Sequence, residues 1–320
     1  MNRTEAPPSG FQQWAIAIIA SRESVETLCD VLRKTTNACG HIPARIDLLI
    51  NGNEQLAIDL GKAMHSWPVQ PNLAIYLWSF SYGDKAATWN AYIHDMNIVA
   101  DHVFILDGYT RPETSSFSEL VAALNAHPDA LAATGVPSVG ASATTIARAM
   151  IRDGGIHGNM FVLSSRAVAE FRRRAIRLPI GLYRVDSLIG AIINFNFDPR
   201  QYQWNKDRIA VQPGATWCFE PLKFWRIKDL LTQLKRRSRQ IQGVLENKSI
   251  RSFLAIQRKP PEKMPETVQE LVTSWWHSQN GPLWYEVLLH PEWNNAYRNI
   301  LLRKRNNTSF QLPPKLIQQI

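Results

Sequence analysis

VFILDGY, residues 103–109, is an apolar run that ends in a single aspartate, Asp107. In an open α/β sheet, a short buried strand of this kind presents a ligand-binding side chain at its carboxyl end. The segment GDKAATWN, residues 83–90, lies just upstream and places Lys85 in a glycine-containing turn. A glycine-containing turn lets the backbone come close to a phosphate group, and a lysine side chain supplies a cation to pair with it. Together the two segments predict a site for a metal-bound nucleotide diphosphate.

The surrounding sequence predicts an α/β fold in which strands and helices alternate. Residues 14–20, WAIAIIA, are apolar on both faces, as expected of a buried parallel strand. Further strands are expected at residues 46–50, 73–77, 103–106 and 160–163, and helices at residues 25–37, 55–65, 85–100, 115–126, 166–174 and from residue 184 onward. This alternation implies a doubly wound sheet with right-handed crossovers, flanked by helices.

Composition narrows the classes of partner. The 320 residues are 45% hydrophobic and 20% charged, which is ordinary for a globular protein, but the net charge is +9. A basic balance suggests an anionic partner. Nucleic acid is unfavoured as that partner, because aromatic residues are not interleaved with the basic run. The three cysteines, Cys29, Cys39 and Cys218, have no metal-binding spacing.

Targeting signals are not evident in the sequence. Residues 1–10 are polar and contain proline, unlike a signal peptide, and no apolar run reaches the roughly 18–20 residues of a membrane-spanning helix. We therefore expect a cytoplasmic protein.

A second carboxylate, Asp186, stands at the start of an expected helix in LPIGLYRVDSLIG, residues 178–190. A helix N-terminus favours an ionised carboxylate, which can act as a general base if it faces a hydroxyl group. Between the two aspartates, the loop GGIHGNMF, residues 154–161, is rich in glycine and lets the backbone approach a ligand. Taken singly, each feature also has an ordinary interpretation, as a turn aspartate, a loop histidine or a helix-start aspartate.

The order and spacing of these segments resemble an inverting family 2 glycosyltransferase with the GT-A fold, over residues 14–245. The resemblance implies that Asp107 holds Mg²⁺ or Mn²⁺ against the diphosphate of a UDP- or GDP-type sugar donor, and that Asp186 is the general base. The sequence departs from the family pattern twice, because Tyr109 replaces the second acid of an Asp-x-Asp motif and Val185 replaces an acid before Asp186.

The same resemblance assigns the remaining candidate site residues. The donor side would contain Ala20, Ser21, Asn51, Lys85 and Asn90, and the acceptor side would contain His157, Gly158 and Asn159. The acceptor would be a glycan or a lipid-linked sugar. Asn51 also fits a plain turn, and Asp84-Lys85 also fits a helix start with Asp84 as the cap.

Residues 223–258 are strongly basic, with the run KRRSRQIQG at residues 235–243. This run lies where processive members of the family carry a Gln-x-x-Arg-Trp motif, but it lacks the tryptophan. It predicts a basic helix that could bind the donor diphosphate, a lipid phosphate or an anionic membrane surface. Peripheral attachment at the inner face of the membrane is therefore a hypothesis, with a solvated basic face as the alternative.

The chain is thus expected to divide into a disordered lead (residues 1–12), a GT-A domain (13–222), a basic helical segment (223–258) and a helical C-terminal appendage (259–320). Two other functions stay open. The two replaced acids favour a non-catalytic, nucleotide-sugar-binding or scaffold protein of the same fold. A nucleotidyltransferase would also use a metal and a diphosphate, but the glycine-rich N-terminal loop it should carry is missing at Ala20-Ser21-Arg22.

Overall fold

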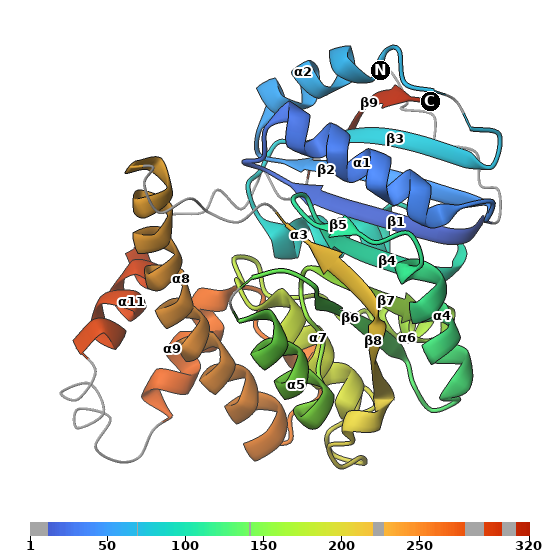
Figure 1. Cartoon of the computed structure of the whole chain (residues 1–320). Coiled ribbons are helices and arrows are strands. Elements are labelled where there is room, and N and C mark those ends of the chain that lie inside the picture. Colours follow the sequence, from blue (N-terminus) through green and yellow to red (C-terminus); the bar gives the residue numbers. More distant parts are fainter. Residues whose placement is uncertain (1–11, 69, 141, 220–226, 279–290, 303–311) are drawn as a thin grey trace.

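The computed structural model describes residues 12–68, 70–140, 142–219, 227–278, 291–302 and 312–320, with the backbone alone for residues 227–238 and Pro291. Its centre is a mixed sheet with helices on both faces (Figure 1). The described strands are β1 Gln12–Ala20, β2 Ala44–Asn51, β3 Leu73–Phe80, β4 Ala100–Asp107, β5 Arg111–Pro112, β6 Ala132–Pro137, β7 Met160–Ser164, β8 Ile209–Cys218 and β9 Lys315–Gln319.

The sheet has the order β5-β8-β6-β7-β4-β1-β2-β3-β9. Strands β4, β1, β2 and β3 are parallel neighbours, and β7 runs antiparallel to β4. The register pairs Ile19 of β1 with Asp107 of β4, and Leu106 with Met160 at the start of β7. The carboxyl ends of four parallel strands and the entry to β7 therefore share one edge, where open α/β sheets bind ligands.

Helices connect the strands and cover the sheet. They are α1 Val25–Cys39, α2 Glu54–Met64, α3 Lys85–Asn90, α4 Ser116–Ala126, α5 Ala143–Asp153, α6 Ser165–Arg173, α7 Val185–Asn194, α8 Ile227–Arg251, α9 Val268–His277 and α11 Pro291–Leu302. Five of these begin at a side-chain cap: Ser24, Asn53, Asp84, Ser164 and Thr267 each accept a backbone N–H of the first turn. The expected helix at 85–100 is shorter, because α3 continues only as a π-helical turn over Ala91–Asp95.

Two apolar cores lie on opposite faces of the sheet, as the alternation within β1 requires. Ile16 and Ile18 face the core shared with α1, α2 and α4. Ala15 and Ala17 face the core shared with α3, α6 and α7, which continues into α8, α9 and α11. In Figure 1 the last three helices pack together beside α7, away from the β1–β3 end of the sheet. The predicted α/β fold with a mixed, helix-flanked sheet is confirmed.

The C-terminal part differs from a purely helical appendage. Its helices α9 and α11 pack on α8, but residues 315–319 form β9, which pairs antiparallel with β3 and extends the sheet. Residues 1–11 of the expected lead, and the side chains of Lys235, Arg236 and Arg237 in the basic run, lie outside the described residues. Within the described part, no helix combines the length and apolar character needed to cross a bilayer.

Candidate functional site

Asp107 is the last residue of β4 and is fixed by its own backbone. Its N–H donates to the carbonyl oxygen of Asn159 at 3.1 Å, and its carbonyl accepts the N–H of Thr110 at 2.9 Å. The Asn159 side chain also donates to the Thr110 hydroxyl at 3.2 Å. The loop before β7 and the turn after β4 are thus tied together, and the carboxylate projects from a rigid edge of the sheet.

The carboxylate of Asp107 has two side-chain partners. The ammonium group of Lys85, at the start of α3, forms an ion pair with Oδ1. The hydroxyl of Tyr109 donates to Oδ2 at 3.1 Å. Both partners are solvent-accessible, since the Lys85 side chain is 29% exposed and Tyr109 is 40% exposed. An incoming anionic ligand can therefore reach the cation from solvent.

The electrostatics of Lys85 connect it to the second predicted carboxylate. Burial by itself would lower the pKa of Lys85, but the charge and hydrogen bond of Asp107, together with the charge of Asp186, raise it. Lys85 is therefore a cation across the physiological range. The negative charge of Asp107 is also the main reason why the pKa of the Tyr109 phenol is raised. The fold thus brings Lys85, Asp107 and Asp186 close enough for their charges to interact, although they are far apart in the sequence.

Asp186 lies in the first turn of α7, against the glycine-rich loop. A Cβ atom at Gly158 would lie 3.2 Å from Cγ and Oδ2 of Asp186, so the loop can approach the carboxylate this closely because residue 158 has no side chain. The neighbouring His157 packs its ring on Trp217, with centroids 4.9 Å apart. Burial lowers the pKa of His157 despite the nearby charges of Asp186 and Asp107. A neutral imidazole therefore borders the two carboxylates.

The start of α7 is held by a buried acid from another helix. Glu246 of α8 is fully buried, and its Oε2 accepts the backbone N–H groups of Tyr183 at 2.9 Å and Arg184 at 2.8 Å. Its Oε1 accepts from Gln242 at 2.7 Å. Burial raises the pKa of Glu246 to about 7, although these hydrogen bonds act in the opposite direction. Because Arg184 precedes α7, this contact sets the position of Asp186.

The other residues predicted on the donor side make contacts within the protein at the same edge. Asn51 accepts the N–H of Asp84 at 2.6 Å and so supports the turn before Lys85. The carbonyl of Ser21 accepts from Asn53 at 2.9 Å, and a Cβ atom at Gly108 would collide with Ala20. These contacts pack the loops after β1, β2 and β4 against one another.

Asn90 is engaged within the protein. Its Oδ1 accepts the Leu178 N–H at 2.8 Å and its Nδ2 donates to the Leu178 carbonyl at 2.9 Å. The side chain is buried and joins α3 to the segment before α7. These bonds tie α3, which begins at Lys85, to the segment before Asp186, and a contact of Asn90 with the donor stays a prediction.

Sequence reasoning missed Glu246, and it treated Tyr109 only as a lost acid. The Tyr109 hydroxyl instead completes the hydrogen bonding of Asp107. Arg184, whose guanidinium packs over the Tyr183 ring at 5.5 Å, was also missed. The contact of Glu246 with the start of α7 leaves no local pattern in the sequence. Tyr109, in contrast, lies two residues after Asp107, and this spacing could have predicted the hydrogen bond between them.

Comparison with known proteins was informative only at the level of structure. No protein-family model and no curated protein sequence matches the chain. A mannosyltransferase from Pyrobaculum calidifontis, PcManGT, solved with GDP-Man and Mn²⁺, superposes with a TM-score of 0.56 at 14% identity, over 94% of this chain and 79% of that chain. S. aureus TarS superposes with a TM-score of 0.47 at 10% identity, over 89% of this chain and 54% of that chain. The superposition on PcManGT shows that the chain has a glycosyltransferase-like fold.

The residues of the site were tested for fit to a divalent metal. Among the described residues, no group of three His, Cys, Asp or Glu side chains could hold an ion. Asp107 is nevertheless accessible at the strand end, and Mg²⁺ commonly binds through one or two carboxylates, water and substrate phosphates. A metal at this site would be bound mainly by a ligand's phosphates, and Asp107, beside Lys85, would be its protein ligand.

Proposed function

We propose that this protein is an inverting glycosyltransferase that uses a nucleotide-diphosphate sugar. The observation that carries the proposal is the convergence of Lys85, Asp107 and Asp186 at the carboxyl edge of the sheet. The cation and the metal-compatible carboxylate would hold the donor diphosphate. A second carboxylate, Asp186 at the start of α7, would take the proton of the acceptor hydroxyl. The fold shared with PcManGT supports the same interpretation at the level of architecture.

In the proposed reaction, the acceptor hydroxyl attacks the anomeric carbon of the sugar. Asp186 takes the hydroxyl proton while the new bond from oxygen to carbon forms and the bond to the diphosphate oxygen breaks. Attack from the side opposite the leaving group gives inversion. Lys85 stabilises the charge that develops on the nucleoside diphosphate as it leaves. A bound Mg²⁺ or Mn²⁺ would neutralise further phosphate charge there.

The donor site can be tested by ligand-induced stabilisation. A ligand present at about 100 times its Kd adds about 2.7 kcal/mol, or roughly 5 °C in Tm. We expect UDP, GDP or one of their sugar esters to give such a shift in the presence of Mn²⁺, and Asp107→Asn to abolish it. Asp101→Asn, an exposed acid on the same strand, is the matched control and should keep the shift. A full panel without any stabilisation of wild-type protein contradicts the proposal.

A non-catalytic nucleotide-sugar-binding protein is the second candidate. It is favoured by Tyr109, which occupies the place of an acid and hydrogen-bonds Asp107. Such a protein would show the same stabilisation by nucleotides. It would release no nucleoside diphosphate from a bound sugar donor, either to water or to any glycan or lipid-linked acceptor, and this measurement separates the two.

A further inference from the structure

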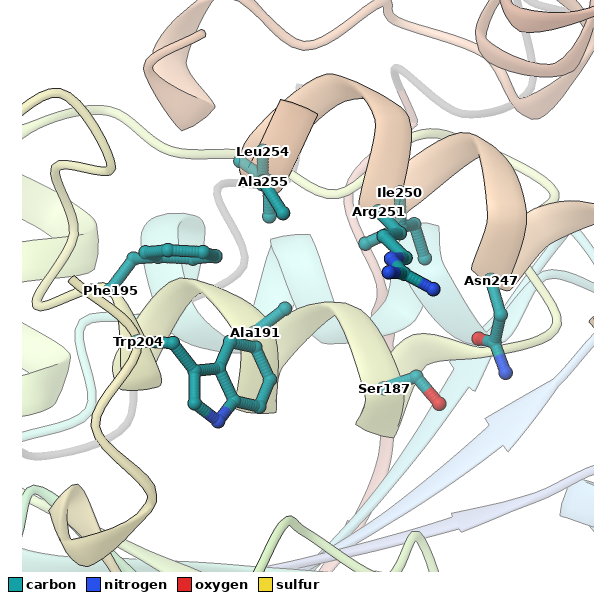
Figure 2. A pocket seen from close by; sticks show the side chains of 9 residues that line it. All are labelled: Ser187, Ala191, Phe195, Trp204, Asn247, Ile250, Arg251, Leu254 and Ala255. Carbon is teal, nitrogen blue, oxygen red and sulfur yellow. The ribbon is translucent and has the colours of Figure 1, made fainter. Parts of the chain in front are cut away.

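A pocket of about 410 Å³ lies between α7 on one side and the end of α8 with the π-helical turn Ser252–Ile256 on the other (Figure 2). The two helices run side by side here in the same direction, so corresponding residues face each other across the pocket. Ser187 and Asn247 lie at one end, and Phe195 and Trp204 lie at the other, with Ala191 on the floor between them. This volume is within the range of pockets that bind small organic molecules.

The pocket changes in polarity along its length. Its polar end adjoins the candidate site, because Ser187 follows Asp186 and Asn247 follows the buried Glu246. Its far end is apolar. Phe195 is buried and packs edge to face on Trp204, with centroids 5.4 Å apart, while Trp204 stays 52% exposed. A half-exposed indole supported from behind is a surface on which an apolar group can pack.

Arg251 supplies a charge between the two ends. Its guanidinium lies along the pocket (Figure 2), and it forms no ion pair with any residue that the structure describes. A cation beside an apolar surface selects ligands that join an anionic group to an apolar group.

We propose that this pocket binds the acceptor of the reaction, and that the acceptor is an anionic amphiphile. Its apolar chain or ring lies against Ala191, Phe195 and Trp204, and its phosphate or carboxylate pairs with Arg251. Its hydroxyl-bearing end then extends past Ser187 to Asp186. This inference rests on the proposed function, because Asp186 is assigned as the base that meets the acceptor.

The pocket can be tested without the donor, by calorimetry on the full chain. The probes are octyl phosphate, octyl β-D-glucoside and inorganic phosphate, the amphiphiles being kept below micelle-forming concentrations. We expect octyl phosphate to bind more tightly than the neutral glucoside, and inorganic phosphate to bind at least about tenfold more weakly than octyl phosphate, because burial of the chain contributes most of the affinity.

Three variants separate the parts of the pocket. Trp204→Ala and Ala191→Phe should each weaken both amphiphiles by about tenfold or more, since one removes the wall and the other fills the space. Arg251→Gln should weaken octyl phosphate by about tenfold and leave the glucoside unchanged. Ile256→Ala is the matched apolar control, because Ile256 is 71% exposed just beyond the pocket. Lys263→Gln is the charge control, an exposed cation that does not line it.

The outcomes distinguish the pocket from the donor site. Nucleotide affinity, measured on every variant, should stay at the wild-type value and shows that each variant is folded. Equal binding of octyl phosphate and inorganic phosphate overturns the proposal, as does amphiphile binding that survives both Trp204→Ala and Ala191→Phe. If nucleotides bind and amphiphiles do not, the pocket proposal fails while the proposed function stands. If wild-type protein binds no nucleotide, the proposed function itself fails.

Discussion

At the scale of single residues, the Asp107 carboxylate bonds to two neighbouring side chains. Asp107 pairs with Lys85 through one oxygen and with the Tyr109 hydroxyl through the other. An acid at residue 109 would repel Asp107 in the absence of a metal, whereas the phenol stabilises its charge by a hydrogen bond. The replacement of the expected acid by tyrosine is therefore compatible with a donor site that depends less on a metal and more on Lys85.

The residue at position 109 should set the metal dependence of the site. Tyr109→Asp adds a second carboxylate, and we expect Mn²⁺ then to tighten nucleotide diphosphate binding by roughly tenfold more than in wild-type protein, since ligand charge sets metal affinity. Tyr109→Phe keeps the ring but not the hydroxyl, and should leave the response to Mn²⁺ near that of wild type. Calorimetry with and without Mn²⁺ measures both. An unchanged response in Tyr109→Asp would place the metal elsewhere or exclude it from this site.

In the proposed reaction Asp186 is the base, so its removal should affect turnover much more than donor binding. General-base catalysis contributes about 10²–10⁴-fold, so Asp186→Asn should lower the transfer rate by at least about 10²-fold with nearly unchanged donor affinity. Asp207→Asn, an exposed acid in another turn, is the control. Transfer at the wild-type rate in Asp186→Asn would reduce this residue to a helix-start aspartate.

At the scale of elements, α8 fixes the start of α7 through a buried acid. Glu246 accepts two backbone N–H groups that precede Asp186, and burial raises its pKa to about 7 from the ordinary value of 4.5. The folded state therefore binds this proton more tightly than the unfolded state. As a result, protonation of Glu246 stabilises the fold below about pH 4.5, and this contribution is lost as the pH rises towards about 7.

Glu246→Gln should remove this pH dependence. The Gln carbonyl oxygen can still accept from Tyr183 and Arg184, so we expect a folded protein. The free energy of unfolding can be measured by urea denaturation at each pH. Between pH 4.5 and 7, that of wild-type protein should fall by up to about 3 kcal/mol more than that of Glu246→Gln. Parallel pH curves for the two proteins would contradict the raised pKa. Glu246→Ala leaves both N–H groups without an acceptor, and it should therefore destabilise the protein at every pH, by about 2–4 kcal/mol.

The elements also show which parts of the structure the sequence could predict. The strand ending at Asp107, the helix starting at Lys85 and the helix containing Asp186 follow local patterns of hydrophobic period and capping. The strand β6, AATGVP, was missed because glycine and proline interrupt it and a Ser/Gly-rich stretch follows. Glu246 was missed because its burial depends on how α8 docks on α7, which no local pattern reports.

At the scale of the whole molecule, the excess of positive charge is distributed unevenly along the sequence. The basic run at residues 235–243 belongs to α8, whose later turns make the Glu246 contact and line the pocket beside α7. One helix could therefore meet an anionic surface along its first half and the acceptor along its second. Membrane attachment stays a prediction, since the side chains of residues 235–238 lie outside the described part.

Vesicle binding tests that prediction. Each Lys or Arg near an anionic leaflet contributes about 1 kcal/mol, and salt screens the attraction over about 10 Å at 0.1 M. Wild-type protein should co-sediment with anionic vesicles at low salt and be released at high salt. The variant with Arg236, Arg237 and Arg239 changed to Gln should lose most of this binding and keep its nucleotide affinity. A triple variant that keeps vesicle binding but loses nucleotide affinity would assign the run to the donor site.

The pairing of β9 with β3 has a consequence for how the protein is made. During synthesis, β1, β2 and β3 leave the ribosome early and can assemble into a parallel core with α1 and α2. The outer edge of β3 then has no partner until residues 315–319 emerge, because these supply its antiparallel neighbour. Unpaired strand edges promote intermolecular association, and contacts between distant parts of a chain form slowly. The nascent protein is therefore exposed to aggregation at this edge from the emergence of β3 until residues 315–319 pair with it.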